Sequence, residues 1–298
     1  MLFLNKIIYF LKYIKNLENI NKLCLEFTCL LDEEKILNKF TEILLNFNNV
    51  KSISVMLYNK TGILEEKKSV GFYNHLAQTV ITIKFKSKIL GILNLYSEKH
   101  LNKYELKIFD ILSSNLAVAL ANAKFYKLAI TDSLTGLYIQ QYFKQRLEYE
   151  IELSIKYKYS ICLLLFDIDY FKKINDNYGH QTGDFILRAL SELIKQNLNQ
   201  NNVFARYGGE EFTVIFPEIS LEEAKQIAED LRKKVEKNEF NFKNTKLKIT
   251  ISIGIGYFSP IKKKKNNEFN CEKLIQLADT ALYQAKNSGR NCIKVNIQ

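Results

Sequence analysis

Residues 206–212 read Arg-Tyr-Gly-Gly-Glu-Glu-Phe and place two glycines directly before two adjacent carboxylates. The apolar runs Val203–Ala205 and Phe212–Phe216 flank them, so the segment is expected at the tip of a β-hairpin. Glycines permit positive φ and remove side-chain bulk, so the backbone can turn tightly and lie close to a ligand. Glu210 and Glu211 offer the hard oxygen donors that divalent cations prefer. A solvated acidic turn has the same pattern, so this motif alone does not decide between the two.

A second carboxylate follows an apolar run elsewhere in the chain. Residues 161–166 are continuously apolar, as in a central strand covered on both faces, and Asp167 follows where this strand would emerge. If the hairpin lies beside the strand, Asp167 converges with Glu210 or Glu211. Such carboxylates repel one another in a partly dry site unless a divalent cation lies between them. The sequence therefore predicts Mg²⁺, or Mn²⁺, completed by substrate phosphates.

Basic residues accompany this acidic cluster. Phe171 and Lys172 follow Asp167 in what is expected to be a turn, whose N–H groups and ammonium could receive phosphate oxygens. Lys286 and Arg290 flank a turn at Gly289. Positive groups around a metal-binding pair favour phosphoryl transfer, in which catalysis is positioning plus charge neutralisation.

Four motifs occur in chain order. They are Asp132-x-Leu134-Thr135-Gly136-Leu137, then Asp167-Ile168-Asp169-x-Phe171-Lys172-x-Ile174-Asn175-Asp176-x-x-Gly179-His180-x-x-Gly183-Asp184, then the 206–212 segment, and finally Ala281-Leu282-Tyr283-x-Ala285-Lys286-x-x-Gly289-Arg290-Asn291. Over about residues 130 to 298 this order resembles the GGDEF family of diguanylate cyclases. The resemblance implies a fold similar to the nucleotidyl-cyclase and polymerase palm core. It also implies a reaction that joins two GTP molecules into cyclic di-GMP and releases two pyrophosphates.

The resemblance also implies a role for each matching position. Asp167 and Glu210 would hold the metal with the Ile168 carbonyl, and Glu211 would be a second ligand or aid deprotonation of the attacking 3′-hydroxyl. The residues expected to bind GTP are Phe171, Lys172, Asn175, His180, Asp184, Gly208, Gly209, Lys286 and Arg290.

Within that set the expected roles differ. Lys172, Lys286 and Arg290, with Phe171, would hold the triphosphate. Asn175 and Asp184 would read guanine, because a carboxylate accepts from the N1–H and N2 amino edge that adenine lacks. His180 is expected to be a structural or positioning residue. Asp132, Asp169 and Asp176 are expected to make turn and capping bonds.

Two segments depart from the family pattern. After Gly136-Leu137 the family usually has Asn-Arg, whereas this chain reads Tyr-Ile-Gln-Gln over residues 138–141, so we expect an altered rate or altered coupling between domains. The product-inhibition site normally reads Arg-x-x-Asp before the hairpin, but residues 199–202 read Asn-Gln-Asn-Asn. We predict weak or absent feedback by cyclic di-GMP at that position.

Length and composition predict two globular domains, since the chain has 298 residues, of which 47% are hydrophobic and 25% charged. The net charge of +11 permits nucleic acid as a partner, but charge is its sole support, so none is expected. Five cysteines without a C-x-x-C pair favour a reducing cytoplasm.

Lysines interrupt the apolar Met1–Ile14 segment, which is too short to span a bilayer. It is expected to pack on its own domain or a partner or to anchor at a membrane surface, and no transmembrane segment is expected. The dense run Lys262–Lys265 is expected to be a solvated loop.

The first half of the chain has its own pattern of elements. Helices are expected over 17–47, interrupted at 31–34, with strands over 52–58, 79–85 and 89–96 and a long helix over 102–130. The order of these elements, the strand around Gly91–Leu95 and the helix ending Leu116–Ala123 resemble a GAF sensory domain. We expect residues 1–125 to form a sensory and dimerisation domain, with a signalling helix from about 102, and residues 126–298 to form the catalytic domain. No bound small molecule is expected in this short copy. Cys24, Cys29 and His75 are expected in core or surface roles.

The second half predicts an α/β (α+β) sandwich with a mostly antiparallel sheet. Helices are expected over 140–156, 183–197, 221–236 and 271–286, strands over 160–166, 247–258 and 292–295, and a hairpin over 203–216. The enzyme would work as a homodimer in the cytoplasm, because one half-site presents one GTP, and its product would act on cyclic di-GMP receptors. The alternative is a non-catalytic module that binds GTP or cyclic di-GMP.

Overall fold

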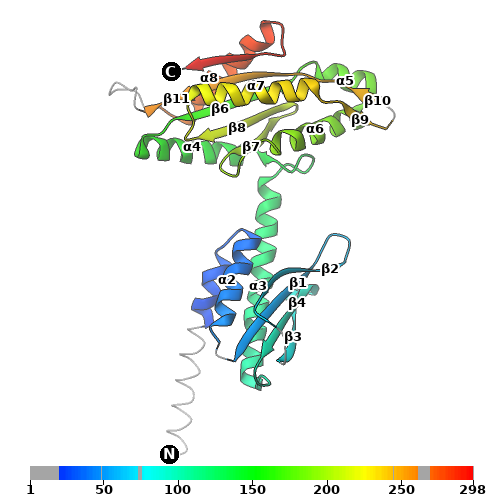
Figure 1. Ribbon diagram of the computed structural model, residues 1–298, viewed down its shortest axis with the longest axis vertical. Coiled ribbons are helices and arrows are strands. Elements are labelled where there is room, and N and C mark those ends of the chain that lie inside the picture. The colour runs from blue at the N-terminus through cyan, green and yellow to red at the C-terminus, as the bar shows by residue number, and fades with distance from the viewer. Residues whose placement is uncertain (1–19, 48, 73–75, 244, 261–268, 298) are drawn as a thin grey trace, which may run out of the picture. The chain divides into compact units, whose positions relative to one another are not determined.

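The computed structural model describes residues 20–47, 49–72, 76–243, 245–260 and 269–297. Its backbone divides into two compact units, Met1–Ala129 and Ile130–Gln298 (Figure 1). The expectations for Met1–Ile14, His75 and Lys262–Lys265 fall outside the described residues.

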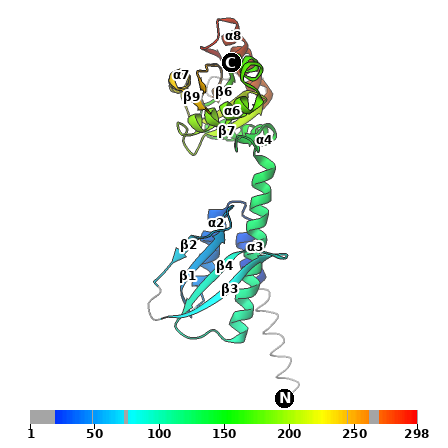
Figure 2. The same ribbon diagram turned by 90° about the vertical axis from the view of Figure 1, so that its right-hand side faces the viewer.

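The first unit is a four-stranded antiparallel sheet with helices on one face (Figures 1 and 2). A helical segment over 20–28 precedes α2 (Glu33–Leu45), and α3 (Lys103–Ile130) closes the unit. The strand order is β2-β1-β4-β3, with bounds β1 (Val50–Tyr58), β2 (Leu64–Val70), β3 (Ala77–Phe85) and β4 (Lys88–Ser97). The break expected at 31–34 is confirmed, because Asp32 caps α2 by accepting a hydrogen bond from the Lys35 N–H at 2.9 Å.

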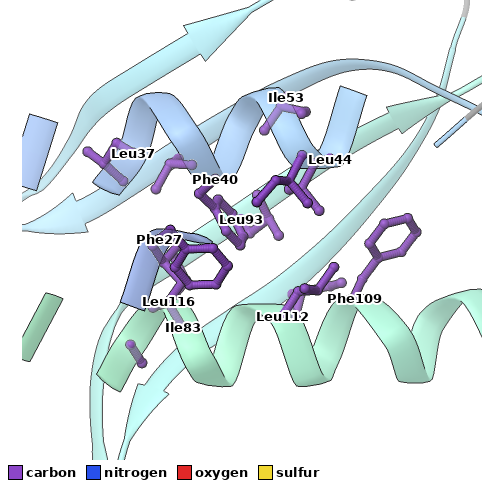
Figure 3. Packing of buried hydrophobic residues seen from close by; sticks show 14 of the residues in the cluster. Phe27, Leu37, Phe40, Leu44, Ile53, Ile83, Leu93, Phe109, Leu112 and Leu116 are labelled. Carbon is purple, nitrogen blue, oxygen red and sulfur yellow. The ribbon is translucent and has the colours of Figure 1, made fainter. Parts of the chain in front are cut away.

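The core of this unit lies between the helices and the sheet. Figure 3 shows side chains of α2 and α3 pointing toward one another, with Leu93 of β4 between them. The rings of Phe27 and Phe40 meet edge to face, with centroids 5.4 Å apart. Cys24 is buried in this core and Cys29 is exposed, as expected for core and surface roles.

The strand β2 was not expected, and it fills much of the gap between the predicted strands ending at 58 and beginning at 79. Its sequence, Leu-Glu-Glu-Lys-Lys-Ser-Val, lacks alternating apolar residues, because the strand lies at the sheet edge and none of its residues is buried. It is held by antiparallel pairing to β1.

Among the described residues, α3 is the one helix whose length and composition would suffice to cross a membrane. Its best 18-residue window has a mean hydropathy of 1.2, and 56% of that window is buried. A helix packed in the core of its own domain has the same properties.

The second unit is a six-stranded sheet of order β12-β11-β6-β8-β7-β5. Its strands are β5 (Tyr138–Ile139), β6 (Ile161–Ile168), β7 (Val203–Gly208), β8 (Glu211–Pro217), β11 (Ile251–Phe258) and β12 (Ile293–Ile297). The three central pairings are antiparallel and the two outermost are parallel, so the mostly antiparallel sheet is confirmed.

Helices cover both faces of this sheet. They are α4 (Gln140–Tyr157), α5 (Phe171–Tyr178), α6 (His180–Lys195), α7 (Leu221–Lys237) and α8 (Cys271–Asn287). One core contains apolar residues of α6 and α7, and a second contains those of α4 and α8. Every residue of β6, which separates the two cores, is buried, as its continuous apolar run predicted.

Three local predictions were wrong. Phe171 and Lys172 begin α5 instead of lying in the turn, which is confined to residues 169 and 170, and α6 begins at His180 instead of Gly183. The apolar signal of α5 is weak because Lys, Asn and Asp make up five of its eight residues. The single strand expected over 247–258 is divided, because Leu247 pairs with Phe240 in the small hairpin β9 (Phe240–Phe242) and β10 (Thr245–Leu247).

Candidate active site

The three predicted catalytic carboxylates come together at one end of the central strands. Asp167 of β6 lies directly opposite Glu211, the first residue of β8, and Glu210 precedes it at the hairpin tip. The expectation that the hairpin lies beside the 161–166 strand is confirmed. Asp167 does not emerge from the strand, however, because β6 continues to Ile168 and the aspartate is only 6% exposed.

Burial and mutual repulsion shape the electrostatics of this cluster. Burial raises the pKa of the Asp167 carboxyl, and the ammonium of Lys286 opposes that rise. Burial also raises the pKa of Glu210 and that of Glu211, and the negative charge of Asp167 adds to both shifts. Three carboxyls that resist ionisation together form a site that favours an added positive charge.

Lys286 supplies one such charge from α8. Its Nζ lies 2.9 Å from Oδ2 of Asp167, and the two side chains are 31% and 9% exposed. Lys286, which was expected to bind the triphosphate of GTP, is thus paired with the carboxylate of Asp167. A cavity of about 340 Å³ adjoins this pair and is lined by Glu211, Asp279, Thr280, Leu282, Tyr283 and Lys286.

The acidic cluster fits a divalent cation by its donor chemistry. Carboxylate oxygens are the ligands that Mg²⁺ and Mn²⁺ prefer, and a cation between them would offset the burial and the repulsion from Asp167 that raise the pKa of Glu210 and of Glu211. Within the described ranges no three His, Cys, Asp or Glu side chains are already arranged around a common metal position. Asp167, one of the expected metal ligands, is instead paired with Lys286.

The hairpin tip is braced by Arg206 of β7. Its Nε and Nη2 donate to the Gly209 carbonyl at 2.9 and 2.7 Å, and its Nη1 donates to both carboxylate oxygens of Asp132 at 3.1 and 3.2 Å. Asp132 also accepts from the Thr135 N–H and hydroxyl, as its expected turn role requires. The sequence motif did not predict this role of Arg206. The available signal was an arginine two residues before a pair of glycines.

The residues expected to read guanine lie where α5 meets α6. A Cβ on Gly183 would lie 1.9 Å from Oδ1 of Asn175, so only glycine leaves room for that amide. Asp184 follows on α6 and is half-buried. The structure thus brings Asn175 and the Gly183-Asp184 pair together.

The other expected nucleotide contacts divide by exposure. Lys172 and His180 are exposed, and their side chains are open to a ligand. Phe171 is buried in the core, and its ring lies under Gly183, so its side chain supports the α5–α6 contact. It can meet a phosphate only through its backbone N–H at the start of α5.

The prediction that Asp169 makes local turn or capping bonds was wrong. It is 5% exposed and accepts from the Thr250 hydroxyl at 2.6 Å, the Ser252 hydroxyl at 2.6 Å and the Asn291 N–H at 3.0 Å. These partners lie between 81 and 122 residues away in the chain, so local spacing contains no signal for them.

The segment at the product-inhibition position forms a local turn. The Asn199 N–H donates to Oδ1 of Asn202 at 3.0 Å, and the Asn201 N–H donates to Oδ1 of Asn199 at 3.0 Å. The two asparagine side chains that replace the family's charged pair therefore stabilise the turn itself. Weak feedback at this position stays a prediction.

A mostly antiparallel sheet that carries acidic residues on its central strands defines the second unit as a nucleotidyl-cyclase palm fold. Residues 129–292 match the family model described as diguanylate cyclase, GGDEF domain. The chain therefore belongs to the GGDEF family.

Curated relatives and solved structures agree with this membership. Diguanylate cyclase A of Treponema denticola is 33% identical over 224 residues, which are 72% of this chain and 58% of that protein. Diguanylate cyclase DgcP of Pseudomonas aeruginosa is 40% identical over 167 residues, which are 56% of this chain and 24% of that protein. The chain thus spans less than two thirds of the length of these relatives.

Two solved structures of DgcB from Caulobacter crescentus, both in complex with c-di-GMP, share the fold. Its GGDEF domain aligns with a TM-score of 0.52 and 33% identity, covering 57% of this chain and 93% of that one. Its coiled coil and GGDEF domain align with a TM-score of 0.58 and 28% identity, covering 66% and 100%.

Proposed function

We propose that the chain is a diguanylate cyclase that condenses two GTP molecules into cyclic di-GMP and two pyrophosphates. The observation that supports this most directly is the convergence of Asp167, Glu210 and Glu211 with Lys286 from three elements far apart in the sequence. Structural pairing alone does not require three carboxyls of raised pKa at one end of a sheet.

Binding and orientation of GTP would involve both sides of the site. The carboxylate of Asp184 would accept hydrogen bonds from the guanine edge. The amide of Asn175, for which Gly183 leaves room, would contact the same base. Lys172 and Arg290 would meet the triphosphate with the first N–H groups of α5, and Lys286 would join them by leaving Asp167. Gly208 and Gly209 keep the hairpin tip free of side chains where the nucleotide would pass.

The chemical step would use the acidic residues. The 3′-oxygen of one GTP attacks the α-phosphorus of the other, its proton passes to Glu211, and pyrophosphate leaves with the electron pair of the bond that joined it to that phosphorus. The same attack in the reverse sense, by the 3′-oxygen of the second nucleotide on the α-phosphorus of the first, closes the ring and releases the second pyrophosphate. The raised pKa of Glu211 makes it a stronger base than an exposed glutamate. Bound Mg²⁺ or Mn²⁺, held by Asp167, Glu210 and the Ile168 carbonyl, would supply charge neutralisation for the phosphates.

The reaction needs two nucleotides that face each other, so the proposed enzyme is a homodimer. Val118, Phe125 and Leu128 of α3 are 41%, 58% and 65% exposed and follow heptad spacing, which supports pairing of α3 with its copy. We further propose that the first unit is a GAF-like regulatory domain, that the protein is cytoplasmic, and that its product acts on cyclic di-GMP receptors.

Product analysis of the full chain tests the function. Incubation with GTP and Mg²⁺ should give cyclic di-GMP and two equivalents of pyrophosphate, and ATP should not replace GTP. Glu210→Ala should abolish product. The matched control is Glu222→Ala, which removes an 80% exposed glutamate of α7 and should leave turnover unchanged. GTP binding without pyrophosphate release would instead favour the non-catalytic module, and equal turnover in Glu210→Ala and the unmodified chain would refute the assignment.

A further inference from the structure

The turn after α8 holds three consecutive residues in left-handed backbone conformations. Gly289, Arg290 and Asn291 have φ of +102°, +64° and +44°. Glycine adopts such angles freely and asparagine occasionally, but arginine does not. A conformation of this kind persists where the surroundings over-determine it, and such positions concentrate at functional sites.

Asn291 is held at its backbone and at its side chain. Its N–H donates to Asp169 at 3.0 Å, and its Nδ2 donates to Glu236 at 2.7 Å. Arg232 of α7 donates to Oδ1 of Asn291 at 2.7 Å and also to Glu236 at 3.0 Å. Asp169 is itself held by the hydroxyl of Ser252 in β11 and by that of Thr250 just before this strand. The turn is therefore attached to the core of the unit.

The side chain of Arg290 is held by a different contact. Its guanidinium carbon lies 4.6 Å from the ring centroid of Tyr170, and its Nη1 lies 3.5 Å from the tyrosine hydroxyl. The ammonium of Lys173 lies 4.7 Å from the same centroid. Tyr170 is 54% exposed and has φ of +58°, so it is another non-glycine residue in the left-handed region.

A solvent-exposed ring under two cations contributes little to the core, but it limits where the guanidinium can point. Tyr170 stands between Asp169, which fixes the turn, and Phe171, which begins α5. The same short segment therefore anchors the backbone of the Arg290 turn and supports its side chain.

We propose that Tyr170 is a positioning residue that holds the Arg290 guanidinium ready for the triphosphate, while the hydrogen bonds of Asn291 fix the backbone beneath it. This inference rests on the proposed function, in which Arg290 contacts GTP. An arginine ordered in advance loses less conformational freedom when the nucleotide binds. The contact with Tyr170 should therefore affect GTP binding and not the chemical step.

Variants of Tyr170 in the full chain test this role. Tyr170→Ala should raise KM for GTP about three- to fivefold, the size of an exposed cation–π contact, and leave kcat within about twofold. Tyr170→Phe keeps the ring and should restore KM to within about twofold, whereas Tyr170→Leu should behave like the alanine variant. The matched control is Tyr178→Ala, at the far end of α5 and 50% exposed, which should leave both constants unchanged.

A double-mutant cycle separates positioning from a general structural effect. In an Arg290→Ala background, Tyr170→Ala should change KM no further, because its action passes through the guanidinium. Equilibrium binding of a non-reactive GTP analogue should weaken by the same factor as KM rises, and binding of GMP should not.

The outcomes distinguish this inference from the proposed function. An unchanged KM in Tyr170→Ala, a loss that phenylalanine does not restore, or an undiminished effect in the Arg290→Ala background would overturn the positioning role in an active enzyme. If the unmodified chain binds the analogue but makes no cyclic di-GMP, the proposed function fails. The binding arm of the experiment then still decides the role of Tyr170.

Discussion

Removal of the Arg206 guanidinium should loosen the hairpin tip that carries Glu210 and Glu211. Arg206→Met keeps the aliphatic stem but deletes the bonds to the Gly209 carbonyl and to Asp132. The side chains of Arg206 and Asp132 are 19% and 22% exposed, so water only partly replaces what is lost.

The magnitude follows from the two groups that lose a partner. A hydrogen bond to a charged group contributes about 1.5–3 kcal/mol, and partial exposure reduces this value. Asp132 retains its two bonds from Thr135, so it is not left unsatisfied. We expect Arg206→Met to lower the free energy of unfolding of the second unit by about 2–3 kcal/mol. Asp132→Asn, which keeps an acceptor for Thr135, should cost about 1–2 kcal/mol.

The effect should depend on pH in a defined direction. Burial acts to raise the pKa of Asp132, but the bonds from Thr135 and from Arg206 outweigh it and hold this pKa below its ordinary value of 3.8. The ionised carboxylate therefore stabilises the folded state above pH 3.8, and that contribution is lost as pH falls through the lower folded-state pKa. The difference between the unmodified chain and Asp132→Asn should be complete at pH 7 and should shrink below about pH 4.

Hydrogen exchange of β8 amides during urea unfolding of the full chain measures this stability without mixing the two units. The control is Arg206→Lys, which keeps the charge but not the forked geometry and should recover part of the loss. Stability of Arg206→Met within about 0.5 kcal/mol of the unmodified chain would refute the reasoning, since such a change is typical of an unremarkable surface site. An Asp132→Asn effect of equal size at pH 7 and pH 3 would refute the pH argument.

Three further outcomes are expected. Lys286→Met leaves Asp167 without its ion partner and should destabilise the second unit by about 2 kcal/mol at neutral pH, an effect that Asp167→Asn should cancel in denaturant unfolding. Gly254→Ala would place a Cβ 2.1 Å from the Ala278 carbonyl, so α8 must move away from β11, and a loss of about 3 kcal/mol should appear in the same assay. Replacing both asparagines at the ends of the 199–202 turn by alanine should leave inhibition of turnover by added cyclic di-GMP unchanged, and tight inhibition abolished by that change would contradict the prediction.

The fold was predictable where one physical signal dominates a long segment. The helix expected over 102–130 is α3, Lys103–Ile130, and the apolar run 161–166 lies within β6. The elements missed were β2, α5, the two-residue strand β5 and the β9–β10 hairpin, which are short or polar and are stabilised by neighbours instead of their own periodicity. Sequence patterns report burial, so elements that bury little leave little signal.

The site was predictable to the extent that it follows from strand pairing. The convergence of Asp167 with Glu211 required only that a buried strand and an adjacent hairpin share a sheet. The placement of the Lys286 ammonium on Asp167 and the bond from Asn291 to Asp169 could not be foreseen. These contacts depend on how α8 and its following turn pack across the sheet, and no local spacing encodes that packing.

Both sides of the site reduce the stability of the unit, one through buried charge and the other through backbone conformation. Burial and the charge of Asp167 raise the pKa of Glu210 and of Glu211, so ionising these groups at neutral pH costs folding free energy. On the other side, Arg290 keeps a left-handed backbone, which costs about 1–2 kcal/mol in a residue other than glycine, asparagine or aspartate. A bound divalent cation would relieve the first cost. The second cost places the Arg290 guanidinium where the phosphates of a nucleotide would bind.

Cation and nucleotide should therefore stabilise the second unit cooperatively. A cation alone must displace Lys286 from Asp167 and leaves that ammonium without a partner, whereas phosphates alone bring negative charge toward the carboxylates. Together they satisfy both sides, so the shift in unfolding midpoint with Mg²⁺ and a non-reactive GTP analogue should exceed the sum of the shifts produced by each. Thermal unfolding of the full chain with Mg²⁺ alone, with the analogue in EDTA, and with both measures this coupling, and Lys286→Met should diminish it. Purely additive shifts would show that the acidic cluster and the phosphate-binding groups do not act on one ligand.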